Sequence, residues 1–128
     1  MEKLNVNEVE LNGVIYIRKD AVTEQAKELN GMPFVLIRSY ASGVHFGYLK
    51  SETETLSGKE VELVNSRRVF YWSGAASLSQ IAIDGVKNSE NCKIAMVLPN
   101  IRIMNIIEII PVSEKAKLNL EGVKIWKQ

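Results

Sequence analysis

The sequence predicts an α+β fold, a mainly antiparallel sheet with two or three short helices, in a single domain over residues 1–128. Many segments alternate apolar and polar residues or form short apolar runs, which is typical of strands. Asn-Gly, Ser-Gly and Pro-Asn pairs separate these segments and indicate turns. Because the predicted strands follow one another without regular intervening helices, antiparallel pairing is favoured.

Residues 6–22 open the chain with the pattern of a β-hairpin. Val9 and Leu11 alternate with polar residues before Asn12-Gly13, and a second apolar run starts at Val14. An Asn-Gly pair favours a two-residue turn because both positions need a positive φ. We therefore expect two short paired strands here.

A short helix is expected next, over Ala21–Leu29. Asp20 is a suitable N-cap, and Asn30-Gly31 is suitable for ending the helix in the left-handed conformation. The apolar stripe of this helix is narrow, so the helix needs a partner surface. We expect it to serve in packing or in oligomerisation.

Two further strands are predicted around a tight turn. Pro33–Tyr40 is almost continuously apolar, which favours burial on both faces, and Val44–Lys50 returns after a Ser-Gly turn. Gly47 inside the second strand indicates a bulge or a close approach of another backbone. Ser51–Gly58 is polar and is predicted to be a loop or a turn.

Lys59–Trp72 predicts a long strand with a bend near Asn65-Ser66. Side chains of a strand point alternately to its two faces, which would place Arg67 and Arg68 on opposite faces. A bulge at the bend would exchange the faces beyond it. The sequence therefore leaves open which arginine lies beside which of the three following aromatic rings.

The C-terminal part predicts two short helices and two more strands. Ala75–Asp84 has a helical apolar stripe, with Ser73 or Gly74 as its N-cap and Gly85 at its end. The remaining elements, in chain order, are strands at Cys92–Leu98 and Asn100–Ile110 with a Pro99-Asn100 turn between them, a helix at Ser113–Leu120 ended by Gly122, and an extended tail at Val123–Gln128.

Composition narrows the possible functions. A net charge of +1 gives no global attraction to nucleic acid or to an anionic membrane. One histidine and one cysteine leave few groups for nucleophilic catalysis or for a zinc site. No apolar run approaches the length of a membrane span, and the first residues lack a signal core, so a cytoplasmic location is expected. We expect no cofactor and no metal.

The segment from Arg67 to Ser79 is the first candidate for a ligand site. Arginine can pair with phosphate, aromatic rings can stack on a base, and the first amides of a helix attract anions. The alternative interpretation is a core strand with solvated arginines. The candidate ligand-binding residues are Arg67, Arg68, Phe70, Trp72, Gly74, Ala75, Ala76 and Ser77.

Four polar residues elsewhere complete the list of candidates. Arg38 and His45 stand on the two arms of the Ser42-Gly43 turn and could form a second wall of a pocket. Asn91 and Arg102 are candidates for contacts with adenine or ribose. The alternative for all four is an ordinary structural or surface role.

Several blocks of the sequence resemble a family of phage and prophage proteins. The blocks are Arg38–Lys50, Arg67–Ser79 with its Gly-Ala-Ala-Ser-Leu-Ser run, Glu90–Lys93, Ile107–Pro111 and Gly122–Trp126. On these motifs the chain resembles the first Thoeris anti-defence family, whose members sequester cyclic ADP-ribose signals. The resemblance covers most of the chain after residue 33.

The resemblance implies a protein that binds without catalysis. Its expected ligand is a glycocyclic ADP-ribose isomer made by bacterial TIR enzymes, held in the host cytoplasm during infection. It implies a homo-oligomer with sites at subunit contacts, and some members also bind cyclic oligonucleotides at a separate site. Two alternatives stay open: a small phage module that binds a host or virion protein, and a nucleotide-cleaving enzyme, for which acid and base groups are scarce.

Overall fold

The computed structural model describes residues 8–11, 14–17 and 24–128. Strands β1 (Glu8–Leu11) and β2 (Val14–Ile17) are antiparallel, with Leu11 opposite Val14. This pairing confirms the two strands of the predicted N-terminal hairpin. The expected turn at Asn12-Gly13 lies outside the described residues.

The helix expected over Ala21–Leu29 is wrong for its described part, residues 24–29. Asn30 and Gly31 both have positive φ, 51° and 81°, and form a tight turn rather than a helix cap. Leu29 and Met32 exchange two backbone hydrogen bonds across this turn, at 3.0 and 2.9 Å. The preceding residues run extended beside residues 112–114, so their hydrogen bonds go to another segment. Residues 21–23 lie outside the described part.

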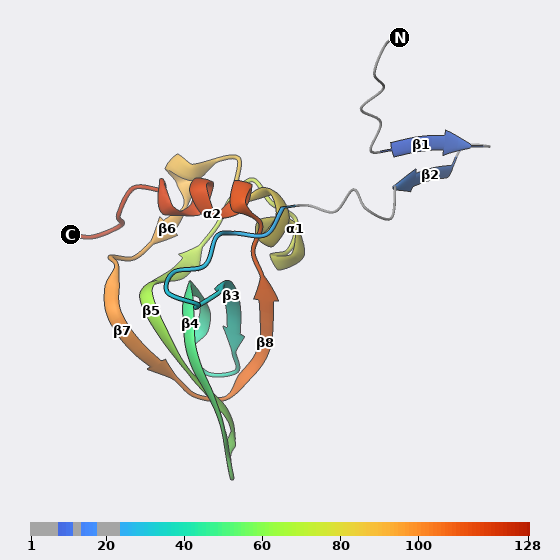
Figure 1. The fold of residues 1–128 in the computed structure, drawn as a ribbon. Coiled ribbons are helices and arrows are strands. Elements are labelled where there is room, and N and C mark those ends of the chain that lie inside the picture. The colour runs from blue at the N-terminus through green and yellow to red at the C-terminus, as the bar shows by residue number, and fades with distance from the viewer. Residues whose placement is uncertain (1–7, 12–13, 18–23) are drawn as a thin grey trace.

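The main sheet has six strands with the order β6-β5-β4-β3-β8, and β7 also pairs with β5. All pairings are antiparallel, as predicted. Although β7 and β8 are joined by a short turn, they pair with different strands, so the sheet curls around one of its faces (Figure 1). The strands are β3 (Phe34–Ser39), β4 (Gly43–Thr55), β5 (Gly58–Tyr71), β6 (Lys93–Ile94), β7 (Leu98–Ile103) and β8 (Ile106–Pro111).

Several strand boundaries differ from the prediction: the strand expected at Cys92–Leu98 is reduced to β6, and the one expected at Asn100–Ile110 is divided into β7 and β8. Ser51–Gly58 is mostly not a loop, because β4 continues to Thr55 and forms a hairpin with β5 that projects from the sheet (Figure 1). Its side chains are polar because that part of the hairpin is exposed on both faces. Pro99-Asn100 is not a turn but lies within β7, where an edge strand tolerates proline. The turn occurs at Asn105, with a φ of 57°.

A β-bulge at the predicted bend determines which face each arginine occupies. Asn65 and Ser66 together lie opposite Gly47, because Tyr48 pairs with Val64 and Phe46 pairs with Arg67. An added Cβ at Gly47 would lie 3.0 Å from the Ser66 Cα, which explains the glycine. The bulge exchanges the faces of β5, so that Arg67 shares its face with Val64 rather than with Leu63.

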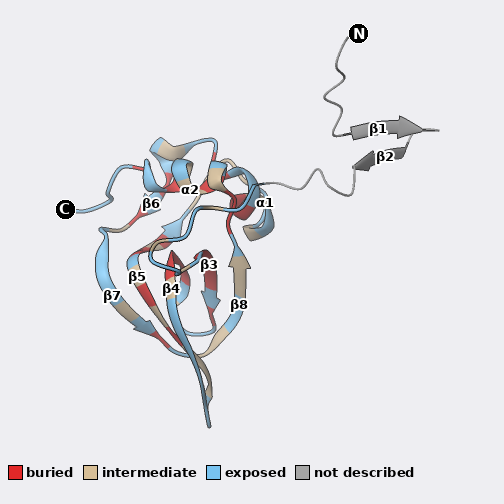
Figure 2. Cartoon of the chain, in the orientation of Figure 1, coloured by how far each residue is buried: buried red, intermediate tan, exposed pale blue. Residues whose placement is uncertain are grey.

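Each face of the curled sheet covers its own apolar core. The outer face packs on helices α1 (Leu78–Asp84) and α2 (Glu114–Glu121), around Phe46, Ile81 and Leu120. The inner face encloses a smaller cluster that includes Ile37 and Leu63. In Figure 2 the buried residues concentrate in the sheet and beneath the helices.

Within the described residues the structure has two α-helices, both in the C-terminal half, and a short 3-10 helix η1 (Ser89–Asn91). Ser77, and not Ser73 or Gly74, caps α1, so this helix begins three residues later than predicted. Gly85 and Gly122 end the two helices as expected. No helix in the described part of the chain is long and apolar enough to cross a membrane.

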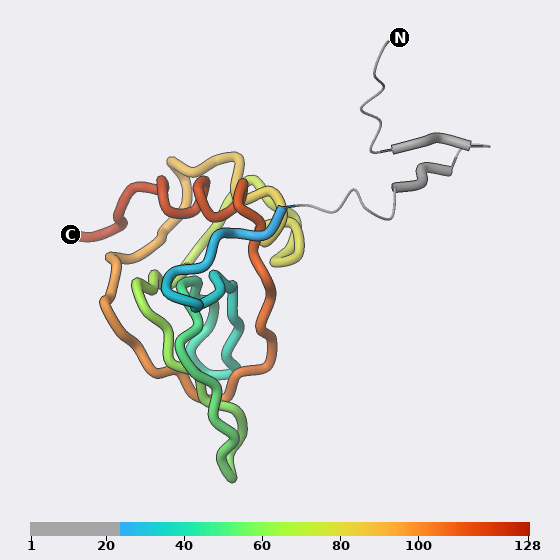
Figure 3. Tube along the Cα trace, in the orientation of Figure 1, coloured from blue at the N-terminus to red at the C-terminus, as the bar shows by residue number. Residues whose placement is uncertain are grey.

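The C-terminal tail runs beside β6. Ile125 forms a parallel bridge with Ile94, and the Trp126 amide donates to the Ile94 carbonyl at 2.9 Å. Figure 3 shows the tail ending on the same side of the molecule as the connection that leads into β7. The tail therefore supplies a side chain to the region where β5, β6 and β7 meet.

Candidate functional site

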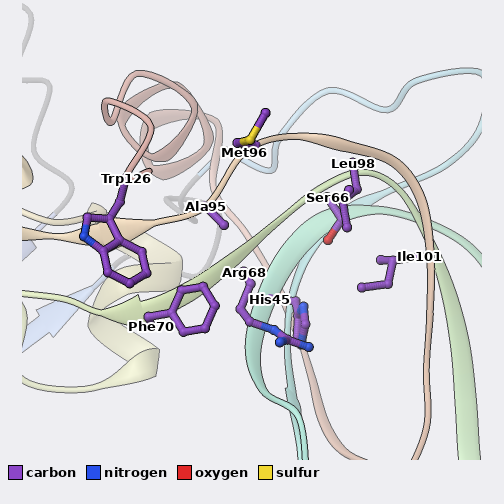
Figure 4. Close-up of a pocket in the computed structure, with 9 residues that line it drawn as sticks. All are labelled: His45, Ser66, Arg68, Phe70, Ala95, Met96, Leu98, Ile101 and Trp126. Carbon is purple, nitrogen blue, oxygen red and sulfur yellow. The ribbon is translucent and has the colours of Figure 1, made fainter. Parts of the chain in front are cut away.

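A cavity of about 330 Å³ opens where the β6–β7 connection crosses β5. Strand β5 places alternate side chains on its inner face here, β4 adds one histidine, and the tail adds Trp126 (Figure 4). Most of the lining is apolar. The lining residues are His45, Ser66, Arg68, Phe70, Ala95, Met96, Leu98, Ile101 and Trp126.

Arg68 and His45 form a hydrogen-bonded group with Ser42 in this pocket. Arg68 donates from Nη2 to the Ser42 hydroxyl at 2.7 Å and from Nε to His45 Nε2 at 3.4 Å. The Ser42 hydroxyl lies 2.9 Å from the same histidine nitrogen and can donate to it. Arg68 Nε and the Ser42 hydroxyl can both donate to Nε2, whereas only the Ser42 carbonyl, at 3.2 Å, could accept from it. We therefore assign Nε2 as the acceptor and place the ring proton on Nδ1.

His45 is neutral at physiological pH. Burial, reinforced by the neighbouring Arg68 charge, lowers the pKa of His45 to about 4, against the weaker opposing effect of the Ser42 carbonyl, which can accept a hydrogen bond from the charged ring. Both main causes disfavour the imidazolium form. The pocket therefore presents a neutral imidazole next to a permanent cation.

Two buried polar atoms of the pocket residues have no hydrogen-bond partner among the described residues. They are Nδ1 of His45 and Oγ of Ser66, whose residues are 0% and 1% exposed. In Figure 4 the Ser66 hydroxyl points toward the interior of the pocket, on the side of Arg68 and His45. A buried polar group without a partner is costly, so a bound molecule that supplied a partner would stabilise these atoms.

Phe70 and Trp126 form the aromatic wall. Their ring centroids are 5.3 Å apart and the rings are inclined by 57°. Arg68 lies 5.7 Å from the Phe70 centroid, and Lys93 lies 5.6 Å from the Trp126 centroid. Within residues 24–128, neither cation forms a salt bridge to a carboxylate. Two cations thus flank a half-exposed aromatic pair.

Arg67 has a structural position on the opposite face of β5. It is 3% exposed, and burial lowers the pKa of its guanidinium. Its N–H groups donate to backbone carbonyl oxygens, and these bonds connect the β6 region with the end of α2 and the tail. The acceptors are the carbonyls of Ala95 at 2.7 Å, Val123 at 2.8 Å, Leu120 and Ile94 at 3.2 Å, and Lys124 at 3.4 Å.

The structure does not bring residues 72–77 into this pocket. Trp72 donates from Nε1 to the Ala75 carbonyl at 3.2 Å and packs against the outer core. An added Cβ at Gly74 would lie 2.5 Å from the Asn88 nitrogen, so this glycine is packed against the chain itself.

The predicted anion site at the start of α1 lies apart from this pocket. Helix α1 has seven residues; the Ser77 hydroxyl accepts the Gln80 amide of its first turn at 3.2 Å, and the Gln80 side chain accepts the Ala76 amide that precedes the cap at 2.7 Å. A helix this short carries only a small dipole beyond its own capping bonds.

Three other predicted residues are exposed and lie apart from the pocket lining. Arg38 pairs with Glu108 at 2.8 Å, and Arg102 pairs with Glu60 at 2.9 Å. Asn91 is in η1. Of the twelve candidates, the structure therefore gathers His45, Arg68 and Phe70 around one cavity.

Sequence reasoning missed Ser66 and Trp126 as pocket residues. Ser66 reaches the pocket because the bulge turns it, and Trp126 is brought in by the tail's pairing with Ile94. No sequence spacing relates Lys93 to Trp126, so the sequence does not identify this cation as a partner of the ring. Within the described residues, no group of three His, Cys, Asp or Glu side chains is placed to hold a metal ion.

Comparison with known proteins gives one family. A domain of unknown function, DUF6948, matches residues 32–120, which is more than half of the chain and includes His45, Ser66, Arg68 and Phe70. No curated protein and no solved structure matches the chain. The chain belongs to the DUF6948 family of domains of unknown function.

Proposed function

We propose that this protein binds and sequesters a cyclic nucleotide signal, such as a glycocyclic ADP-ribose isomer, without cleaving it. The observation that carries the proposal is the aromatic pair Phe70–Trp126 between two cations that no described carboxylate neutralises. Aromatic faces stack on nucleobases, and a cation without a carboxylate partner attracts phosphate. Together they match a ligand that is both planar and anionic.

The pocket chemistry favours binding over bond cleavage. Its lining contains no carboxylate and no thiol, and its one histidine is held neutral. A general acid–base mechanism works best with a group whose pKa is near the operating pH, which His45 does not have. A protein that acts by depleting a signal instead needs affinity, about 12 kcal/mol for a dissociation constant near 1 nM.

We further propose that the protein acts in the host cytoplasm as a homo-oligomer. Phe70 and Trp126 are 54% and 46% exposed, so a second copy could cover them and close the pocket. Light scattering after size exclusion, with and without ligand, measures the oligomeric state.

Equilibrium dialysis tests the proposed function. Cyclic ADP-ribose isomers and cyclic oligonucleotides are dialysed against the protein, and we expect uptake of at least one cyclic nucleotide. Arg68→Gln should reduce this uptake at least about tenfold, whereas Tyr71→Leu should not. Tyr71 is the control because it lies on the same strand, is as exposed as Phe70 and is absent from this pocket. Equal uptake by Arg68→Gln and wild type would place the site elsewhere.

A protein-binding module is the second candidate. The observation in its favour is an apolar rim at the pocket, Met96-Val97-Leu98, whose residues are 52%, 51% and 46% exposed. Exposed apolar patches often mark interaction surfaces. Val97 does not line the cavity, so Val97→Ser should weaken a protein partner while leaving nucleotide uptake unchanged.

A further inference from the structure

The cavity is too small to take a dinucleotide whole. Its volume of about 330 Å³ is at the lower end of the range for small-molecule sites. It can hold one ring system with a substituent. If the proposed function is correct, one part of the ligand enters the cavity and the remainder lies at its mouth.

The cavity lining favours the base as the part that enters. Phe70, Met96, Leu98, Ile101 and Trp126 provide a mostly apolar surface. Burying a phosphate among such side chains is costly unless several charged donors surround it. Arg68 is the one cation of the lining, and two of its N–H groups already bond to Ser42 and His45.

The unpartnered polar atoms match the edge of a base. The Ser66 hydroxyl can donate and accept, and the Nδ1 proton assigned to His45 can donate. Neutral groups of this kind suit the ring nitrogens and exocyclic groups of a heterocycle. A nucleobase that reached both atoms would supply their missing partners while its faces contacted apolar side chains.

Lys93 offers a cation on the outer side of the aromatic wall. It is exposed, it lies against the Trp126 ring at 5.6 Å, and it does not line the cavity. Within residues 24–128 it forms no salt bridge. A phosphate held there would stay hydrated while gaining an opposite charge.

We infer that the ligand enters base first: Ser66 and His45 recognise the uncharged edge of the nucleobase, and Lys93 attracts the phosphates that remain outside. This inference rests on the proposed function and adds the orientation of the ligand. It also assigns Ser66 and Lys93 as binding residues.

His45 is the only histidine of the sequence, so its ring nitrogens report on the pocket without ambiguity. The test uses full-length protein, without a histidine tag, labelled with ¹⁵N-histidine and titrated at pH 7. The probes are a cyclic ADP-ribose isomer, adenosine and inorganic pyrophosphate. We expect the cyclic isomer and adenosine to shift the Nδ1 resonance, and pyrophosphate to leave it unchanged.

Two variants distinguish contacts to the base from contacts to the phosphates. Ser66→Ala should weaken adenosine and the cyclic nucleotide alike, about fivefold for one lost hydrogen bond. Lys93→Gln should weaken the cyclic nucleotide about threefold and leave adenosine unchanged, because adenosine has no phosphate. Exposed Lys87→Gln is the control for the loss of one positive charge and should change neither.

The possible results lead to different conclusions. A shift of Nδ1 by pyrophosphate, or a cyclic nucleotide that binds without shifting Nδ1, would overturn the base-first orientation and leave the proposed function standing. Equal losses for adenosine and the cyclic nucleotide in Lys93→Gln would also overturn it. Failure of every cyclic nucleotide to bind would overturn the proposed function, and the orientation with it.

Discussion

Arg67 and Arg68 are adjacent in the chain but lie on opposite faces of β5. Arg67 is buried against the outer core and donates to backbone carbonyls of β6, α2 and the tail. Arg68 lines the inner pocket and bonds to Ser42 and His45. Two residues of the same type therefore have separable roles, and substitutions should distinguish structure from binding.

Arg67→Ala should destabilise the fold by about 3 kcal/mol or more, because it leaves several buried carbonyls without donors. Urea unfolding followed by circular dichroism measures the change. Arg102→Gln is the control: its salt bridge is exposed, so its effect should stay within about 0.5 kcal/mol. An unchanged urea midpoint for Arg67→Ala would show that these carbonyls do not depend on the arginine.

Ser66→Ala should stabilise the free protein by about 1 kcal/mol, because it removes a buried hydroxyl that has no partner among the described residues. A gain in stability together with a loss of ligand affinity is the signature of a residue kept for binding. Thermal unfolding of the ligand-free variant measures the first effect. A clear loss of stability would mean that the hydroxyl supports the bulge.

Stability should fall as the pH drops below about 6.5, and the cause is His45. Its folded pKa of about 4 lies below the unfolded value of 6.5, so the unfolded state binds the proton first. This contribution is fully present above pH 6.5 and is lost as the pH falls toward 4. The loss of stability amounts to about 2 kcal/mol at pH 5. His45→Gln lacks it, so its urea midpoint should change less than that of the wild type between pH 7 and pH 5. Parallel pH curves would contradict the assignment.

Gly74→Ala should destabilise the fold by about 2 kcal/mol or more. Its φ is 90°, and an added Cβ would meet the backbone of residues 87 and 88. Gly43→Ala is the matched control, because Gly43 has a similar φ of 83° with no atom within 4 Å of an added Cβ. It should cost only about 1 kcal/mol. Equal losses for the two variants would show that backbone strain, and not packing, keeps glycine at position 74.

Local sequence signals correctly predicted the elements whose structure depends mainly on residues near them in the chain. The apolar run of β3, the helix ended by Gly122 and the glycine at Gly85 were all interpreted correctly. Asn30-Gly31 was misread because the same pair can end a helix or form a two-residue turn. Pairing with residues 112–114 decides between these outcomes, and no nearby residue encodes that pairing.

The candidate site was predictable only in part, for the same reason. The composition of Arg67–Trp72 indicated an arginine and an aromatic ring, and Arg68 and Phe70 do line the cavity. The bulge at Asn65-Ser66 sets which arginine faces inward, and the sequence predicted the bend but not its register. Trp126 packs against Phe70 although it lies more than fifty residues later in the chain. The pairing of the tail with Ile94 brings it there, and no local sequence pattern indicates that pairing.

The most direct test of the central claim is recovery of the ligand after binding. The protein is incubated with a glycocyclic ADP-ribose isomer, freed of unbound ligand and heat-denatured, and the released small molecule is identified by mass spectrometry. We predict recovery of the intact cyclic molecule from the wild type and from Tyr71→Leu, and little recovery from Arg68→Gln. A cleaved product, or equal recovery from Arg68→Gln, would contradict binding without cleavage in this pocket.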